Sequence, residues 1–361
     1  MSDSSTIRMI AAHVQRSPAP MFLSSFFRTP PENIHDAEKV EIDVDRDDED
    51  IAVPVPDLST GPRHNEASKY VNKSFTPPIL SESAAITAWE AIKRQAGQNP
   101  FEDPSFARNA GTRAFNLMDR LRDKCRRTVE LMAAQVFSLG VITLVDSGGV
   151  TVFSEDFKPK TAHMITVSTT WATDGSTGSP LADIAAAARL IRKDGKRSPD
   201  RIVFGASAMQ RFLANAAVQK QLDKSILNLG NLDPAKRNED ATFYGMIWID
   251  SYQYELWLYD AFFKHPQTGT LTPYVGDEDL LIMSSKARLD LTFGSIPMIV
   301  PPDARALAFL PPRIQNGPKQ IDLTINAWVT PNGQSVQLSV GTRPLPIPTE
   351  IDSFARINVT V

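Results

Sequence analysis

The residues best suited to chemistry in this sequence are the carboxylates of an acidic run, and the chemistry they suggest is calcium binding. Asp43, Asp45 and Asp47 stand at positions one, three and five of a possible calcium loop. Such a loop requires glycine at its sixth position and glutamate at its twelfth, where this sequence has Asp48 and Pro54. Because alternate residues of a strand share a face, the three acids are instead predicted to form a solvated or partner-facing stripe.

A serine in a possible nucleophile turn is the second candidate. Ser207 follows Gly205 and Ala206, after a strand-like run and before a helical pattern, as a hydrolase nucleophile would. The second glycine of that motif is replaced by Met209. Ser207 is therefore better explained as the N-cap of the following helix.

The other catalytic and cofactor motifs are incomplete. The histidines lie far apart in the sequence, with no pair four residues apart and none beside Cys125, so no zinc site is predicted. Gly148 and Gly149 lack the further glycine and lysine of a phosphate-binding loop. We therefore predict no catalytic residue, no metal site and no cofactor. The histidines are His13, His35, His64, His163 and His265.

Composition predicts a large globular protein that is neither exported nor embedded in a membrane. The 361 residues, 42% of them hydrophobic, are enough for a sizeable core and about two domains. The single cysteine, Cys125, is predicted to be a small buried residue and favours a reducing site of synthesis such as a bacterial cytoplasm. No stretch resembles a signal peptide or approaches the roughly 18 apolar residues of a membrane span. The net charge of −4 argues against sequence-specific nucleic-acid binding.

Charge is unevenly distributed along the chain. Residues 32–57 contain eleven acids and two bases, a local charge of −9 that leaves +5 for the rest. Within this segment Val40, Ile42 and Val44 alternate with acids, which predicts a strand with one apolar face. The stretch 63–80, which carries Lys69 and Lys73, is predicted to return as the second arm of a long hairpin. Such an acidic excursion suits a surface or a partner better than a core.

An apolar anchor precedes this excursion. Met21, Phe22 and Leu23, followed by Phe26 and Phe27, are surrounded by Ser, Pro and charged residues that cannot form a core of their own. The anchor is therefore predicted to pack onto something larger, and the sequence leaves open whether that is its own subunit or a neighbour.

The longest predicted element is a helix from Pro104 to Leu139. Asp103 and Pro104 form a start signal, and Gly140 forms a stop signal. An apolar stripe runs along the helix, which would be roughly 50 Å long. Its basic cluster is predicted to form ion pairs on a solvated or inter-subunit face, in preference to a DNA-binding face. The stripe is Phe115, Met118, Leu121, Cys125, Val129, Met132, Val136 and Leu139; the basic residues are Arg120, Arg122, Lys124, Arg126 and Arg127, interleaved with Asp119, Asp123 and Glu130.

The shorter elements predict a mixed α and β centre and a β-rich end. Helices are expected from Ser83 to about Gln95, over Leu181–Lys193 and over Ser207–Asp223. Strands are expected over 141–145, 150–153, 201–204, 243–250, 254–259, 279–283, 321–329, 335–340 and 355–361.

This order of elements resembles the major capsid proteins of tailed bacteriophages, specifically the lambda-type capsid protein E family. The likeness spans nearly the whole chain from about Met21 and depends on order and spacing. It is carried by Phe26-Phe27-Arg28, Glu38 to Asp43, Arg127 to Gln135 with Gly140-Val141-Ile142, Trp171, Pro180 to Ile184 with Ile191-Arg192-Lys193, Pro199 to Phe204, and Pro344-Leu345-Pro346 with the closing strand.

The resemblance implies an α+β chain with the Hong Kong 97-like capsid fold. Residues 1–39 would form an N-terminal arm and 40–80 an extended loop that reaches over a neighbouring subunit. Residues 81–180 would begin a peripheral domain around a spine helix at 104–139. Residues 181–300 would form an axial domain, and 301–361 would return to the peripheral domain.

The resemblance also implies a structural function in the virion. The chain would assemble with itself into hexamers and pentamers of an icosahedral shell around double-stranded DNA, which it would contact only non-specifically. Separate scaffolding, portal and decoration proteins would be its other partners, and covalent crosslinking through Lys69 or Lys73 is not expected. A tail-tube component is the alternative. The expected inter-subunit residues are Phe26, Phe27, Val40, Ile42, Val44, Asp47, Asp48, Lys69, Lys73, Arg120 and Arg127.

Overall fold

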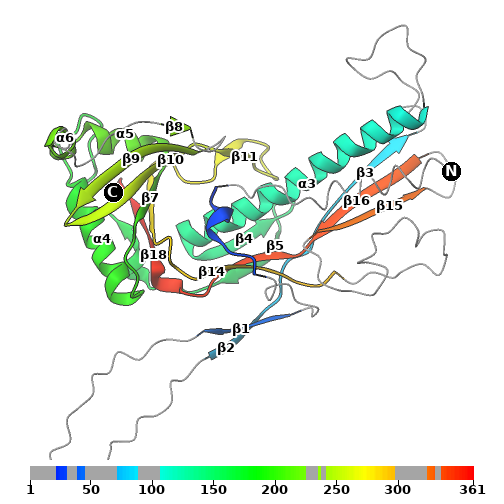
Figure 1. Cartoon of the computed structure of the whole chain (residues 1–361), viewed down its shortest axis with the longest axis horizontal. Coiled ribbons are helices and arrows are strands. Elements are labelled where there is room, and N and C mark those ends of the chain that lie inside the picture. The colour runs from blue at the N-terminus through cyan, green and yellow to red at the C-terminus, as the bar shows by residue number, and fades with distance from the viewer. Residues whose placement is uncertain are drawn as a thin grey trace, which may run out of the picture.

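The computed structural model shows an elongated α+β molecule (Figure 1). It describes residues 22–30, 39–44, 71–87, 106–224, 235–236, 241–296, 323–329 and 335–361. One end holds a seven-stranded sheet covered by helices, and a long helix with a three-stranded sheet extends to the other end. A two-stranded hairpin leaves the body between them.

The long helix α3 spans Phe106–Leu139, which confirms the predicted helix; residues 104 and 105 lie outside the described residues. Its 34 residues correspond to about 50 Å. Met118, Leu121 and Cys125 pack on the three-stranded sheet, whereas Met132 and Phe137 lie in a second, larger core. One apolar stripe therefore serves two cores in succession along the helix.

The three-stranded sheet consists of β15 (Thr324–Val329), β16 (Ser335–Thr342) and β3 (Leu80–Thr87), in that order and antiparallel. The predicted helix starting at Ser83 is wrong over residues 83–87, and its remainder lies outside the described residues. In β3 the side chain of Ile86 is buried beneath α3, and Ser81 and Ser83 are exposed. Pairing with β16 along all eight residues explains why a weak local helix signal does not prevail.

The seven-stranded sheet has the order β6-β18-β13-β7-β10-β9-β8. Helix α4 (Pro180–Asp194) and helix α5 (Ala206–Ala214) bury Ile184, Ile191 and Phe212 against it. The strands are β6 (Met164–Thr166), β7 (Arg201–Phe204), β8 (Ala235–Lys236), β9 (Ala241–Ile249), β10 (Tyr252–Tyr259), β13 (Asp279–Met283) and β18 (Phe354–Asn358).

The helix predicted over Ser207–Asp223 is two helices, α5 and α6 (Ala216–Lys224). The break falls at Asn215, whose Oδ1 accepts a hydrogen bond from the backbone N–H of Ala217 at 3.0 Å. The predicted N-cap is also wrong, because Gly205 holds that position and Ser207 is already helical. Gly205 fits there because a Cβ would lie 2.1 Å from the carbonyl oxygen of Gly276.

A hairpin follows α3 directly. Strands β4 (Val141–Val145) and β5 (Thr151–Asp156) pair antiparallel. The side-chain amide of Gln135 lies along the other edge of β4, donating to the carbonyl of Thr143 and accepting from its N–H, both at 2.9 Å. At Thr143, a side chain thus takes the place that a third strand would have.

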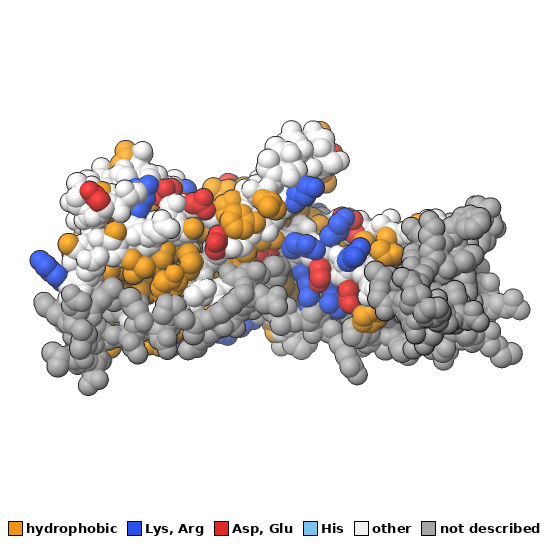
Figure 2. Space-filling view, turned by 90° about the horizontal axis from the view of Figure 1, so that it is seen from above, with side chains coloured by type: hydrophobic (Ala, Val, Ile, Leu, Met, Phe, Trp, Pro, Cys, Tyr) orange, Lys and Arg blue, Asp and Glu red, His pale blue; other side chains and the backbone are white. Residues whose placement is uncertain are grey.

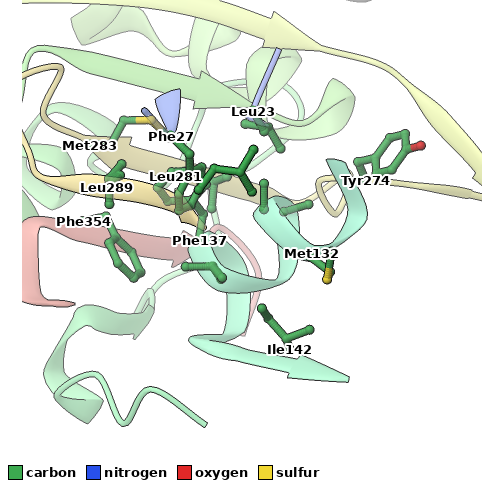
Figure 3. Packing of buried hydrophobic residues seen from close by; sticks show 14 of the residues in the cluster. Leu23, Phe27, Met132, Phe137, Ile142, Tyr274, Leu281, Met283, Leu289 and Phe354 are labelled. Atoms are coloured by element: carbon green, nitrogen blue, oxygen red, sulfur yellow. The ribbon is translucent and has the colours of Figure 1, made fainter. Parts of the chain in front are cut away.

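The larger core lies where these parts meet. Figure 3 shows Leu23 and Phe27 of the N-terminal segment facing Phe137 of α3 and Leu281 of β13. The remaining short elements of the described chain complete the fold. They are η1 (Ser24–Phe26), η4 (Thr161–His163), β11 (Phe262–Lys264), β12 (Leu271–Pro273), β14 (Leu289–Phe293), β17 (Pro344–Pro348) and η6 (Ile351–Ser353).

Candidate inter-subunit surfaces and the contacts that position them

The described residues contain no candidate metal site: no three of their His, Cys, Asp or Glu side chains come close enough to hold a metal ion. Ser207 lies in the first turn of α5, whose buried residues are Ala208, Met209 and Phe212. No helix in the described part of the chain is long and apolar enough to cross a membrane. The candidate sites are therefore the surfaces expected to contact other subunits, together with the contacts that hold these surfaces in place.

The N-terminal anchor docks on its own subunit, which settles the choice that the sequence left open. Phe22, Leu23 and Phe27 are buried, and Phe26 is half-buried against the same core. The ring of Phe22 lies 5.1 Å from Trp257 and 5.3 Å from Tyr259, both in β10. Aromatic pairs at such distances stabilise beyond their buried area.

Glu130 of α3 holds this anchor in place. It is fully buried, and its carboxylate accepts hydrogen bonds from the backbone N–H groups of Leu23 at 2.7 Å and Ser24 at 2.9 Å. The hydroxyl of Tyr259 donates to the same carboxylate at 2.6 Å. The predicted surface ion pair of Glu130 is therefore wrong: the residue joins the anchor, α3 and β10 inside the core.

The predicted hairpin is present at its root. Strand β1 (Val40–Val44) pairs antiparallel with β2 (Val71–Phe75), and residues 45–70 lie outside the described residues. Val40 and Phe75 are buried in the larger core, with the Phe75 ring 5.8 Å from that of Phe157. These contacts fix where the hairpin leaves the body.

A buried arginine fixes the strand that follows the hairpin. The guanidinium of Arg343 donates to the carbonyl of Pro77 at 3.1 Å and to that of Ser295 at 2.8 Å. Gly294 packs against both Pro77 and Arg343, at a distance where an added Cβ would lie 3.2 Å from the Pro77 ring. The return from the hairpin into β3 is thus tied to the segment after β14.

The basic residues of α3 fall into two sets. Arg122 and Arg126 are half-buried and bind Asp119 and Asp123, with N–O distances of 3.2 Å for Arg122–Asp119 and 3.4 Å for Arg126–Asp123. Burial and the charge of Arg122 lower the pKa of Arg126, although Asp123 opposes the shift. The second set, Arg120, Lys124 and Arg127, is exposed. The interleaved ion pairs predicted from the sequence are therefore confirmed for the first set.

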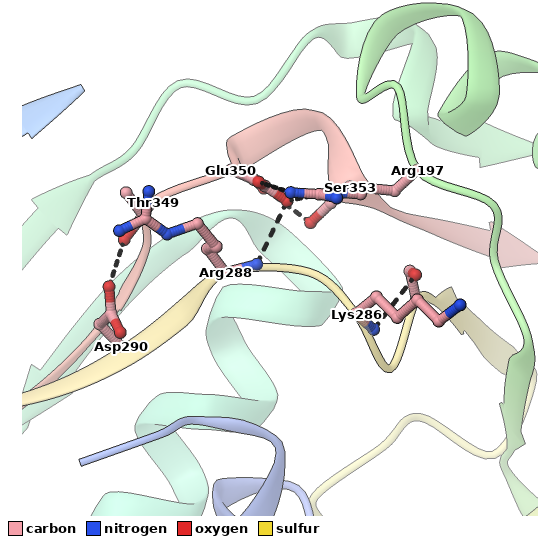
Figure 4. A network of polar contacts seen from close by, with 8 residues as sticks. Arg197, Lys286, Arg288, Asp290, Thr349, Glu350 and Ser353 are labelled. Carbon is pink, nitrogen blue, oxygen red and sulfur yellow. Dashed lines mark hydrogen bonds and ion pairs between the residues drawn. The ribbon is translucent and has the colours of Figure 1, made fainter. Parts of the chain in front are cut away.

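A polar junction joins the segment after α4 to the residue that precedes η6 (Figure 4). Arg197 donates to both oxygens of Glu350, at 2.8 and 2.5 Å, and the backbone N–H of Arg288 donates to the same carboxylate at 3.2 Å. Burial alone would raise the pKa of Glu350, but the hydrogen bonds from Arg197 and Arg288 outweigh it and lower the pKa below 4.5. Nearby, the buried His163 lies between the Phe354 carbonyl and Asp194, at 2.9 and 3.2 Å.

An open groove of about 1000 Å³ lies on α4. Its wall is mostly apolar, with Leu181, Ala185 and Leu190, and Arg189 and Asp250 supply charge. Helix α4, on which the groove lies, is at the far side of the seven-stranded sheet from α3 (Figure 1). The groove has too few converging polar groups for a small-molecule site of the usual kind.

The expected inter-subunit residues do not share one environment. Phe27 and Val40 are buried within the subunit, so their side chains stabilise its own core. Arg120 and Arg127 lie exposed on α3 and are available to a partner. Asp47, Asp48 and Lys69 lie outside the described residues, as do the side chains of Ile42, Val44 and Lys73.

Sequence reasoning missed Glu130 and Arg343 as organising residues. A signal for Glu130 exists: from Leu131 to Phe137 the helix is apolar on almost every side, so an acid at its border is expected to enter the core. Arg343 stands between Gly341 and Pro344 with no pattern that marks it as buried.

Comparison with solved structures defines the class of protein. A prophage capsid protein from Escherichia coli CFT073 has a TM-score of 0.67 at 14% identity, covering 98% of each chain. A phage-related protein from Bordetella bronchiseptica RB50 follows with a TM-score of 0.49 at 12% identity, covering 98% of this chain and 96% of that one. The fold is that of the tailed-phage major capsid proteins, the Hong Kong 97-like fold.

A family model then identifies the branch. The model described as phage major capsid protein E matches residues 6–359, and the chain belongs to that family. A search of curated proteins gave no match. This chain is a major capsid protein of a tailed bacteriophage, and many copies of it build the shell of the virion. Neither the family nor the fold supports the tail-tube alternative.

Proposed function

We propose that the chain assembles into hexamers and pentamers of an icosahedral shell around double-stranded DNA, after synthesis in the cytoplasm of the bacterial host. The family match over residues 6–359 carries this proposal. The role is structural and involves no catalysis. Separate scaffolding, portal and decoration proteins complete the particle.

We further propose that the hairpin rooted at β1 and β2 is the extended loop of the family and reaches over a neighbouring subunit. Two features of the subunit support this. Figure 1 shows β1 and β2 running away from the rest of the molecule, and Val40 and Phe75 bury the root of the hairpin in the larger core. A loop with a fixed exit point can contact a neighbour in a defined register.

We propose the domain boundaries from the resemblance to the family alone. Residues 1–39 form the arm, 40–80 the extended loop and 81–180 the first part of the peripheral domain. Residues 181–300 form the axial domain, and 301–361 return to the peripheral domain. The seven-stranded sheet with α4 and α5 falls mainly in the axial part, and α3 with β3 falls in the peripheral part.

Expression of the full chain with and without a scaffolding protein, followed by electron microscopy, tests the proposal. Closed shells with fivefold and sixfold capsomers are the expected product. Helical tubes, or subunits that stay small under every assembly condition, would overturn it.

A further inference from the structure

Residues 160–166, called the strap below, end in the edge strand β6 of the seven-stranded sheet. The strap consists of Lys160, η4 and β6, and it leads from the β4–β5 hairpin to the sheet. Strand β6 pairs with β18 over only three residues. Because a short edge strand has few backbone hydrogen bonds to hold it, the contacts of its side chains decide how firmly the strap docks.

His163 is a buried polar residue at the centre of the strap. None of its side chain is exposed, whereas Figure 2 shows Lys, Arg, Asp and Glu side chains at the surface of the molecule, where water can solvate them. The Nδ1 atom of His163 lies 2.9 Å from the carbonyl oxygen of Phe354 in β18. Its Nε2 atom lies 3.2 Å from Oδ2 of Asp194 at the end of α4. The two ring nitrogens therefore tie the strap to two different elements.

Both partners of the ring are hydrogen-bond acceptors. A backbone carbonyl can only accept, and so can an ionised carboxylate. Asp194 is ionised at neutral pH, because the hydrogen bond from Lys160 holds the pKa of its carboxyl group below the ordinary value, although burial opposes this shift. A neutral imidazole has one N–H group and satisfies only one of the two acceptors. Only a ring that is protonated on both nitrogens donates to Phe354 and Asp194 at once.

We propose that His163 is held as a doubly protonated, positively charged ring, and that this ring clamps the strap onto α4 and β18 in a pH-sensitive way. Loss of one proton breaks one of the two hydrogen bonds and removes the positive charge that faces Asp194. Burial disfavours a charged ring, but the carboxylate and the carbonyl replace the water that the ring has lost. The inference concerns the subunit itself and does not depend on shell assembly.

Asp194 carries the negative charge that faces the ring in the described part of the chain. Lys160 shares this carboxylate, with its Nζ 2.8 Å from Oδ1, whereas His163 faces Oδ2. Glu350, which precedes η6, is bound by Arg197. Strand β6 carries no charged residue. The other charged residues on the last turn of α4, on η6 and on β18, none of them bound to the ring, are Arg192, Lys193, Asp352 and Arg356.

The direction of the pH dependence follows from proton binding. A histidine in the unfolded chain is protonated only below about pH 6.5, whereas the docked strap keeps the proton of His163 to higher pH. The contribution of the clamp is therefore present in full below this pH and is lost as the pH rises above neutrality. Alkaline solution is expected to release the strap from the sheet edge.

Nitrogen-15 NMR of the dissociated full-length subunit tests the protonation state directly. At pH 7.5 an exposed histidine is mostly neutral, whereas His163 is expected to carry protons on both ring nitrogens. His265 is the internal control, because its Nδ1 accepts a hydrogen bond from the backbone N–H of Gln267 at 3.3 Å and is expected to carry no proton. A His163 ring with one bare nitrogen at this pH would overturn the proposal.

Asp194→Asn separates the effect of charge from the mere presence of a partner. The asparagine amide can donate to a bare Nε2, so His163 is expected to become neutral at pH 7.5 while it keeps its hydrogen bond to Phe354. Lys160→Gln is the matched control. It removes a charge from the same cluster but leaves the contact between His163 and Asp194, so both ring protons are expected to remain. A ring that stays doubly protonated in the Asp194→Asn subunit would also count against the proposal.

Hydrogen exchange measures the docking of the strap. Protection of the backbone amides of residues 163–167, corrected for the intrinsic exchange rate, is expected to fall at least about fivefold between pH 7 and pH 9.5 in the unmodified subunit. The amides of α5 serve as reference and are expected to stay protected. In the Asp194→Asn subunit the protection of the strap is expected to change less than about twofold, because its neutral ring has no proton to lose. Equal pH dependence in the two subunits, or none in the unmodified one, would overturn the clamp.

Discussion

Replacing Glu130 with alanine removes a side chain that binds the N-terminal anchor, α3 and β10 together. The carboxylate is the acceptor of hydrogen bonds from Leu23, Ser24 and Tyr259, and all of these groups are buried. The substitution leaves α3 itself intact, because alanine favours helix. The substitution is therefore expected to weaken the docking of the anchor and to leave the stability of the helix unchanged.

The size of the effect follows from those three bonds. Removing the acceptor of a buried hydrogen bond costs about 1 to 3 kcal/mol, and these losses are not fully additive. We expect Glu130→Ala to lower the free energy of unfolding by about 3 to 5 kcal/mol. Tyr259→Phe removes one hydrogen bond and keeps the two bonds from the backbone N–H groups. We therefore expect it to lower the free energy of unfolding by about 1 kcal/mol.

Urea unfolding of the dissociated subunit measures the decrease in the free energy of unfolding for both variants. At a slope of about 3 kcal/mol per molar, Glu130→Ala shifts the midpoint down by about 1 M or more. Trp257 reports the anchor separately, because its ring lies 5.1 Å from that of Phe22. Glu82→Ala serves as control, because Glu82 is partly exposed and makes only a surface ion pair with Lys124, so an effect within about 0.5 kcal/mol is expected. A midpoint for Glu130→Ala equal to that of the control, with unchanged Trp257 fluorescence, would refute the reasoning.

Three further predictions concern single residues. Because the folded-state pKa of Glu350 is lowered, its contribution to stability is present above pH 4.5 and is lost as the pH falls through the folded value; Glu350→Gln should therefore lower the thermal midpoint at pH 7, and the difference should shrink toward pH 3. Burial raises the pKa of Cys125 to about 11, so a thiol reagent at pH 8 should modify it at least about a hundredfold more slowly in the folded subunit than in urea. Gly195→Ala places a Cβ 2.2 Å from the carbonyl oxygen of Asp352, so the urea midpoint should fall by an amount equivalent to about 2 kcal/mol or more, whereas Ala186→Gly, exposed on α4, should cost about 1 kcal/mol.

The parts of the fold that the sequence predicts are those set by local chemistry. Strands Arg201–Phe204 and Asp279–Met283 have the predicted bounds, because each is a short apolar run between turn residues. Helix α3 was predicted because its apolar stripe and its Gly140 stop signal are local features. Asp250 was predicted to end its strand, but its positive φ of 47° places it in the turn before β10.

The missed features depend on residues far away in the sequence. Residues 83–87 form a strand because β16, which is more than 200 positions later, pairs with them. The role of Glu130 depends on an anchor 106 residues upstream of it. The docking of Phe27 could not be decided from the sequence, because its partner Phe137 lies on a different element.

Gln135 has a consequence for a protein that exists as many crowded copies. An open strand edge offers unpaired N–H and C=O groups to any other chain, and such edges start aggregation. The Gln135 amide occupies the N–H and C=O groups of Thr143 on this edge of β4, so these two groups are not open to another chain. Because its amide group resembles a peptide bond, the side chain of Gln135 fills a place on the sheet edge that a strand of another chain would otherwise take.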